Sequence, residues 1–156
     1  MNQALLPFIN LIIKNYFRML FLVSLISKTI FPNSVQSYIA SFLKSTGISK
    51  IVFETLSINL SVIYFVFYLI LQLLEVSILY YSFVQEKIFE KLITLTITFF
   101  LCISVFAYMF NIPGDCGCFG EVIEFSNNIY KVIFNLVNLI IVVTYIVINK
   151  KINRTH

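Results

Sequence analysis

The feature that most constrains the fold is a set of four long apolar segments, at about residues 11–31, 58–84, 92–110 and 130–149. A helix that crosses the hydrocarbon core of a bilayer needs about 20 apolar residues. The chain has 156 residues, of which 60% are hydrophobic and 12% are charged, whereas soluble domains carry about 25% charged residues. The sequence therefore predicts an all-α, integral membrane four-helix bundle that forms a single domain over residues 1–156, with no catalytic domain outside the membrane.

The first two apolar segments differ in how their boundaries are marked in the sequence. The first ends before Pro32, which a helix interior tolerates poorly. Basic residues precede its apolar run, as in a signal peptide, but no small-x-small cleavage site follows, so we expect an uncleaved helix. The second segment is longer than the roughly 20 residues that a span requires, so we expect it to be tilted or to begin in the membrane interface.

A short amphipathic segment lies between the first two spans. Asn33, with Gln36 three residues later, is expected to cap the N-terminus of a helix, and Gly47 is expected just beyond its C-terminus. We therefore predict a helix that lies in the membrane interface and covers the end of the bundle at which the first span connects to the second. Its two faces are an apolar one with Val35, Ile39, Phe42 and Leu43, and a polar one with Ser34, Ser37, Ser41 and Lys44.

Charge and residue counts exclude several classes of site. The formal net charge is +4, but the basic residues are scattered, and the one cluster, Lys150, Lys151 and Arg154, lies beside a helix end. Such a cluster indicates membrane topology, so we expect no nucleic-acid partner. The single histidine is His156, so we expect no metal site. Three cysteines are too few for a disulfide scaffold.

Orientation is predicted from the basic residues near the ends of the spans. Cytoplasmic loops of membrane proteins carry an excess of lysine and arginine. With the N-terminus inside, the cytoplasmic side holds Lys14, Arg18, Lys87, Lys91, Lys150, Lys151 and Arg154, and the other side holds Lys28, Lys44, Lys50 and Lys131. We therefore expect a multi-pass protein of the bacterial inner membrane with both termini in the cytoplasm. The loop at residues 111–129, which has no basic residue, would then face the periplasm.

That loop contains the sequence Asp-Cys-Gly-Cys-Phe-Gly at residues 115–120. A bridge between Cys116 and Cys118 closes only three residues and removes roughly 1.6 kcal/mol of unfolded-state entropy, against about 3 kcal/mol for fifteen residues. A bridge this short stabilises little, and geometric strain makes a disulfide more reducible. Gly117 allows whatever turn closure requires. We interpret Cys116 and Cys118 as a redox-active pair, with a structural bridge, metal ligation or free thiols as alternatives.

Nearby charges bear on the reactivity of this pair. Acidic residues in the loop should raise thiol pKa values and slow attack by the thiolate. A basic side chain that reaches the loop would counter them, and Lys28 and Lys131 are the candidates. Cys102 falls near the middle of the third span, where a thiol is more often a small hydrophobe than a redox partner.

Polar residues inside the spans form the other candidate site. A carboxylate at a helix centre costs about 2.5–3.5 kcal/mol on insertion scales, so Glu75 should face the bundle and have a partner or a proton. Arg18 and Lys28 are the natural partners, although they lie nearly three turns apart and cannot both reach it equally. The pair is either a packing contact or part of a cofactor or substrate site. Asn135 and Asn138 share a helix face and are expected to form interhelical hydrogen bonds.

Taken together, these residues resemble the methylamine utilisation protein MauE family and its DoxX-like relatives, which are small bacterial inner-membrane proteins with four helices. The matching positions are Arg18 and Lys28, Glu75, the Cys-Gly-Cys-Phe-Gly string with its preceding aspartate, and Asn135. The resemblance implies a role in maturing an exported, disulfide-rich partner together with a thioredoxin-like protein. It implies that Cys116 and Cys118 are the redox pair, with Glu75, Arg18, Lys28 and Asn135 as supporting positions.

The sequence thus predicts a thiol–disulfide redox component that contacts membrane lipid and acts with an exported thioredoxin-like protein or disulfide-rich substrate. No cofactor is expected within the chain, and a membrane quinone is the candidate carrier for the electrons. The alternatives are a non-catalytic membrane anchor or subunit of a respiratory or DoxX-like complex, and a small transporter gated by Glu75.

Overall fold

The computed structural model describes residues 5–47, 59–112 and 127–152, and within these residues the chain forms five helices and no strands. Four of the helices are long and apolar enough to cross a membrane, which confirms an all-α, multi-pass membrane architecture. The helices are α1 (Leu5–Ile30), α2 (Pro32–Ser45), α4 (Leu60–Val84), α5 (Glu86–Met109) and α6 (Asn128–Ile152).

Helices α1, α5 and α6 begin before the apolar segments from which they were predicted, whereas α4 lies within its predicted segment. Helix α1 begins at Leu5 rather than near residue 11, and α5 begins at Glu86 rather than near residue 92. Glutamate and lysine are good helix formers, so the polar stretch before the third apolar run continues the helix. A single extended residue, Gln85 (φ −148°, ψ 102°), separates α4 from α5.

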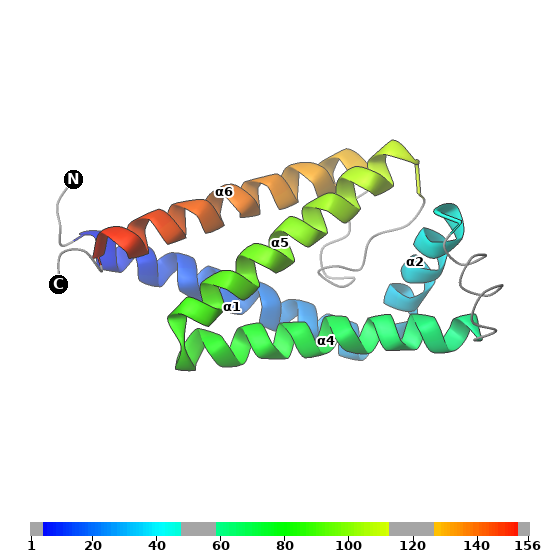
Figure 1. Ribbon diagram of the computed structural model, residues 1–156, viewed down its shortest axis with the longest axis horizontal. Helices are drawn as coiled ribbons and strands as arrows, with labels where there is room; N and C mark the ends of the chain where they lie inside the picture. The colour runs from blue at the N-terminus through cyan, green and yellow to red at the C-terminus, as the bar shows by residue number, and fades with distance from the viewer. Residues whose placement is uncertain (1–4, 48–58, 113–126, 153–156) are drawn as a thin grey trace.

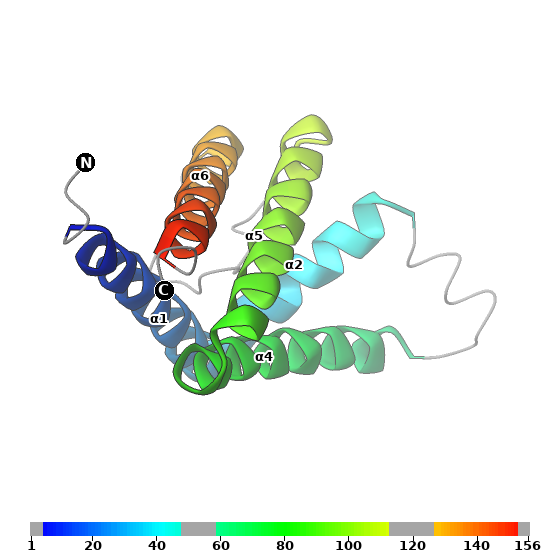
Figure 2. The same cartoon turned by 60° about the vertical axis from the view of Figure 1, so that its left-hand side comes forward.

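The four long helices form a ring in which each contacts two neighbours (Figures 1 and 2). Helix α1 packs against α4 and α6, and α5 packs against α4 and, most extensively, against α6. The N-terminus of α1 and the C-terminus of α6 lie at the same end of the bundle as the α4–α5 turn, while α2 lies at the opposite end (Figure 1). The C-terminus of α5 and the N-terminus of α6 also lie at the α2 end.

Apolar side chains form most of the buried core, and much of the remaining apolar surface faces outward. Large exposed side chains such as Phe8, Leu73, Phe83, Leu95 and Ile140 lie along all four long helices. In a soluble protein this surface would be a liability, whereas lipid solvates it. The buried core comprises Phe17, Leu20, Phe21, Tyr38, Ile78, Phe89, Ile93, Ile97, Phe100, Ala107, Ile112, Val142 and Tyr145.

Helix α2 closes the bundle at the end opposite the termini and contacts α4 and α1. Its buried side chains include Val35 and Leu43, as predicted, and also Tyr38, which the apolar pattern missed. Phe42 packs against Phe106 of α5, with 5.4 Å between the ring centroids.

The ends of α2 match the prediction at one terminus only. Asn33 is not the N-cap, because the helix already begins at Pro32, which occupies the first helical turn with no side-chain cap. Proline is favoured there because its missing N–H would have no partner. Gly47 follows the C-terminus with φ +72°, and its N–H donates to the Lys44 carbonyl at 3.2 Å. This left-handed glycine confirms the predicted C-terminal stop.

Candidate functional site

The predicted redox pair lies outside the described residues, since Cys116 and Cys118 fall within residues 113–126. The structure does describe the C-terminus of α5 and the N-terminus of α6, which flank residues 113–126. The Asn128 side-chain amide donates to the Ile112 carbonyl at 3.2 Å and to the Ala107 carbonyl at 3.4 Å. Asn128 is the first residue of α6, so these bonds tie it to the C-terminus of α5. The chain therefore leaves and re-enters the bundle at one place, at the α2 end.

A buried ion pair between Lys28 of α1 and Glu75 of α4 occupies the interior of the ring. Both residues have an exposed fraction of 0%. The Lys28 ammonium donates to Glu75 Oε1, and the Ser24 hydroxyl donates to the same oxygen at 2.7 Å. Ser24 and Lys28 are four residues apart and so lie on one face of α1. Glu75 was predicted to face the bundle and to have a partner or a proton; it faces the bundle, and its partner is Lys28.

A second set of hydrogen bonds supports the pair from the end of α1. The Lys28 carbonyl would normally accept a bond from the residue four positions later, but that residue is Pro32, which has no N–H. The Tyr68 hydroxyl donates to this carbonyl instead, at 3.0 Å. Gln72 in turn donates to the Tyr68 hydroxyl at 2.7 Å. Helix α4 therefore satisfies the backbone group that the proline leaves without a donor.

The energetic balance of such a pair is set by its isolation from water. Removing two charges from water costs several kcal/mol per ion, and their attraction offsets this only when the remaining hydrogen-bonding positions are also filled. The Lys28 ammonium lies 5.6 Å from the centroid of the Phe100 ring on α5, a cation–π contact that supplies further stabilisation. Glu75 Oε2 is buried, and no described residue donates to it.

Arg18 does not contact Glu75 and instead binds the C-terminus of α4. Its guanidinium donates to the Ser82 carbonyl at 2.6 Å and to the Ser82 hydroxyl at 3.0 Å, and it stacks over the Phe83 ring at 4.0 Å. The last four carbonyls of a helix lack partners within the helix, and a cation there also complements the helix dipole. Arg18 is therefore a capping residue near the termini, more than two turns along α1 from Lys28.

Asn135 and Asn138 form the interhelical hydrogen bonds that the sequence predicted. The Asn135 amide donates to the Ser104 hydroxyl on α5 at 2.7 Å, and the Tyr16 hydroxyl on α1 donates to Asn138 Oδ1 at 2.8 Å. Both asparagines are buried. The Asn135 amide also approaches the Phe100 carbonyl at 3.5 Å, so it contacts the same residue of α5 whose ring lies near Lys28.

These two asparagines belong to a longer polar row on α6, of which only these two members were predicted to form interhelical hydrogen bonds. Its buried members Lys131, Asn135, Asn138, Tyr145 and Asn149 recur at intervals of three or four residues, with Val142 in the one apolar place. Near the termini, the Tyr145 hydroxyl donates to Glu86 of α5 at 2.8 Å, and Asn149 donates to Glu90. The helical spacing was the available signal, but the apolar residues between these positions concealed it.

The two lysines proposed to influence the loop have different surroundings. Lys28 is engaged by Glu75. Lys131 is 2% exposed, and its ammonium lies 3.1 Å from Asn128 Oδ1 and 5.9 Å from the Tyr38 ring centroid. Because Asn128 also binds the end of α5, Lys131 is the one whose contacts adjoin the point where residues 113–126 begin and end.

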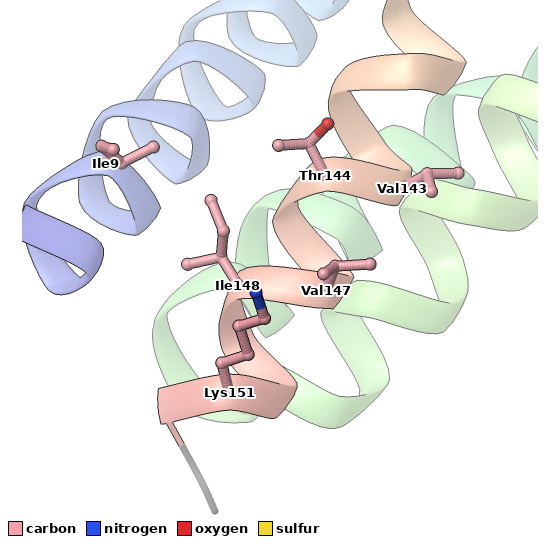
Figure 3. A pocket seen from close by; sticks show the side chains of 6 residues that line it. All are labelled: Ile9, Val143, Thr144, Val147, Ile148 and Lys151. Carbon is pink, nitrogen blue, oxygen red and sulfur yellow. The ribbon is translucent and has the colours of Figure 1, made fainter. Parts of the chain in front are cut away.

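The remaining candidates show no further chemistry in the part of the chain that the structure describes. Cys102 is a free thiol exposed on the outer face of α5. No group of three or more potential metal ligands occurs among the described residues. Figure 3 shows an open, mainly apolar groove between α1 and α6 near the termini, lined by Ile9, Val143, Thr144, Val147, Ile148 and Lys151. Both helices are long and apolar enough to span a membrane.

Comparison with other proteins gives no family assignment. No protein-family model matches the chain, and no curated protein and no solved structure is detectably similar to it.

Proposed function

We propose that this protein is a thiol–disulfide redox component of the bacterial inner membrane that works with an exported partner. The observation that carries the proposal is the Cys116-Gly117-Cys118 sequence between two spanning helices. The tied ends of α5 and α6 support it, because they fix where this segment leaves the bundle. The resemblance to the MauE family motivates the choice of an exported, disulfide-rich partner or a thioredoxin-like protein.

The proposed chemistry is thiol–disulfide exchange. A thiolate of the partner attacks one sulfur of the Cys116–Cys118 disulfide, which forms a mixed disulfide and releases the other sulfur as a thiolate. A second partner thiolate then attacks the mixed disulfide. The partner leaves with a new disulfide, and the chain holds two thiols, having gained two electrons and two protons. A membrane quinone would accept the two electrons and two protons and become a quinol, which restores the Cys116–Cys118 disulfide. Run in reverse, the same steps reduce the partner.

The proposal includes an orientation. With both termini in the cytoplasm, as the distribution of basic residues favours, the α2 end of the bundle faces the periplasm. Thiols on that side meet an oxidising environment. Labelling of intact cells with a membrane-impermeant maleimide tests this. Labelling of Cys116 and Cys118 only after mild reduction is expected, and labelling that requires permeabilised cells would contradict the orientation.

Trapping of a mixed disulfide tests the exchange itself. Cys116→Ser and Cys118→Ser each leave one cysteine of the pair without its resolving partner. We expect one of these variants to accumulate a covalent adduct that is visible on non-reducing gels and lost on reduction, and both to lose function. Cys102→Ser is the matched control, because Cys102 faces outward on α5 and should give neither effect. If both loop variants stay functional and neither forms an adduct, the protein is an anchor or subunit instead.

A further inference from the structure

The carboxylate of Glu75 is bonded unevenly. Its Oε1 oxygen accepts from both the Lys28 ammonium and the Ser24 hydroxyl. Its Oε2 oxygen is equally buried, and within residues 5–47, 59–112 and 127–152 no group donates to it. An ionised carboxylate has about four lone-pair positions, and a buried acceptor without a donor is costly. The charged form of Glu75 is therefore only half satisfied by its protein surroundings.

We propose that Glu75 is a reversible proton-binding site inside the membrane, with the proton carried on Oε2. The step is the transfer of a proton from a hydronium ion to the carboxylate, which yields a neutral carboxyl group and a water molecule. Protonation there turns the unfilled acceptor into a neutral hydroxyl. It leaves Oε1 as a carbonyl-type acceptor that keeps its bonds from Lys28 and Ser24. The proton is thus added without breaking any hydrogen bond of the site.

The contacts of Lys28 remain in place when Glu75 is protonated. When Glu75 is neutral, the ammonium loses its counter-ion but keeps Oε1 as an acceptor and the Phe100 ring at 5.6 Å. The Tyr68 hydroxyl, bonded to the Lys28 carbonyl, holds the backbone of α1 in place in both states. The pair can therefore exist with or without its negative charge in one packing arrangement.

Few other titratable groups face the pair in the described structure. Helix α1 contributes Lys28, since its Arg18 is bound to Ser82, and α4 itself contributes Tyr68. Helix α5 presents the Phe100 ring at this level. Helix α2 adds Tyr38, which lies in the same core, and the buried Lys131 of α6 lies with its ammonium 5.9 Å from the Tyr38 ring centroid. The carboxylates of α5, Glu86 and Glu90, are bonded to Tyr145 and Asn149 of α6.

Infrared difference spectroscopy of the full chain in lipid nanodiscs tests the proposal. Spectra at acid minus alkaline pH should contain a carbonyl band from a protonated carboxyl group that shifts in heavy water. The band should be lost in Glu75→Gln. It should be retained in the matched control Glu90→Gln, which removes a carboxyl from α5 that is not part of the pair. Glu75→Asp keeps a carboxyl group in a changed setting and should move the band rather than delete it.

The outcomes separate this inference from the thiol chemistry. A variant with both Cys116 and Cys118 replaced by serine should keep the band, because the proton site does not depend on the redox pair. If Glu75→Gln and Glu75→Asp both give the spectrum of the unchanged protein, Glu75 does not change its protonation state between the two pH values. That result would overturn the proposal whatever the mixed-disulfide experiments show.

Discussion

Replacing Lys28 by methionine should destabilise the bundle far more than the same change at Lys14, another ion-paired lysine on α1. At a pH at which Glu75 is ionised, Lys28→Met leaves its carboxylate buried without a counter-ion, and breaking a buried ion pair from one side costs about 3–5 kcal/mol. Lys14 lies 3.8 Å from Glu86, with side-chain exposed fractions of 20% and 38%. Exposed pairs contribute about 1 kcal/mol or less. Because about 1.4 kcal/mol is a factor of ten in an equilibrium constant, the two variants should differ by more than tenfold in their folding equilibria.

A double substitution makes the reasoning sharper. Lys28→Met combined with Glu75→Leu removes both charges and fills the space with apolar side chains. Replacing a whole buried pair in this way is often neutral or stabilising, so the double variant should be more stable than Lys28→Met alone. The free energy of unfolding, measured by titration with a denaturing detergent in mixed micelles, is compared for the unchanged protein, Lys14→Met, Lys28→Met, Glu75→Leu and the double variant. A Lys28→Met variant as stable as Lys14→Met would contradict this expectation, and so would additive losses of unfolding free energy from Lys28→Met and Glu75→Leu.

Two further predictions concern single hydrogen bonds. Tyr68→Phe removes the donor that stands in for Pro32 at the Lys28 carbonyl, and should lower the free energy of unfolding by about 1–3 kcal/mol; a variant as stable as the unchanged protein would show that another donor reaches this carbonyl. Tyr16→Phe removes the bond to Asn138, and a double-mutant cycle with Asn138→Leu should give a coupling of about 0.6 kcal/mol, the average for such bonds in membranes. A coupling near zero would mean that this contact contributes nothing to the packing of α1 on α6.

The fold was largely predictable because the bilayer imposes a length and a composition on each spanning helix. The errors occur where polar residues continue a helix, as at Glu86, or where the backbone itself decides the boundary, as at Pro32. Apolar runs in the sequence indicate which residues contact lipid or the core. They do not indicate at which residue the hydrogen-bonded backbone of the helix begins.

The sequence predicted that Glu75 would have a partner or a proton inside the bundle, but it did not determine whether that partner is Arg18 or Lys28. A carboxylate inside a span requires a partner, and that rule placed Glu75 correctly. The choice between Arg18 and Lys28 depends on how the antiparallel α1 and α4 are aligned along their axes. Arg18 lies opposite Ser82, so Lys28, about 15 Å further along α1, reaches the level of Glu75. This alignment results from the packing of whole helices and cannot be obtained from either sequence segment alone.

The polar row of α6 also has a consequence for how the protein is made. Asn135, Asn138, Tyr145 and Asn149 bond to side chains of α5 and α1, all of which precede α6 in the chain. Chains are synthesised from the N-terminus, so the receiving groups are already in the bilayer when the last span emerges from the ribosome. Buried polar groups in lipid without partners are costly. Because of this order of synthesis, the polar side chains of α6 can find their partners as soon as α6 enters the bilayer. An α6 segment that entered before α1 and α5 would have no such partners.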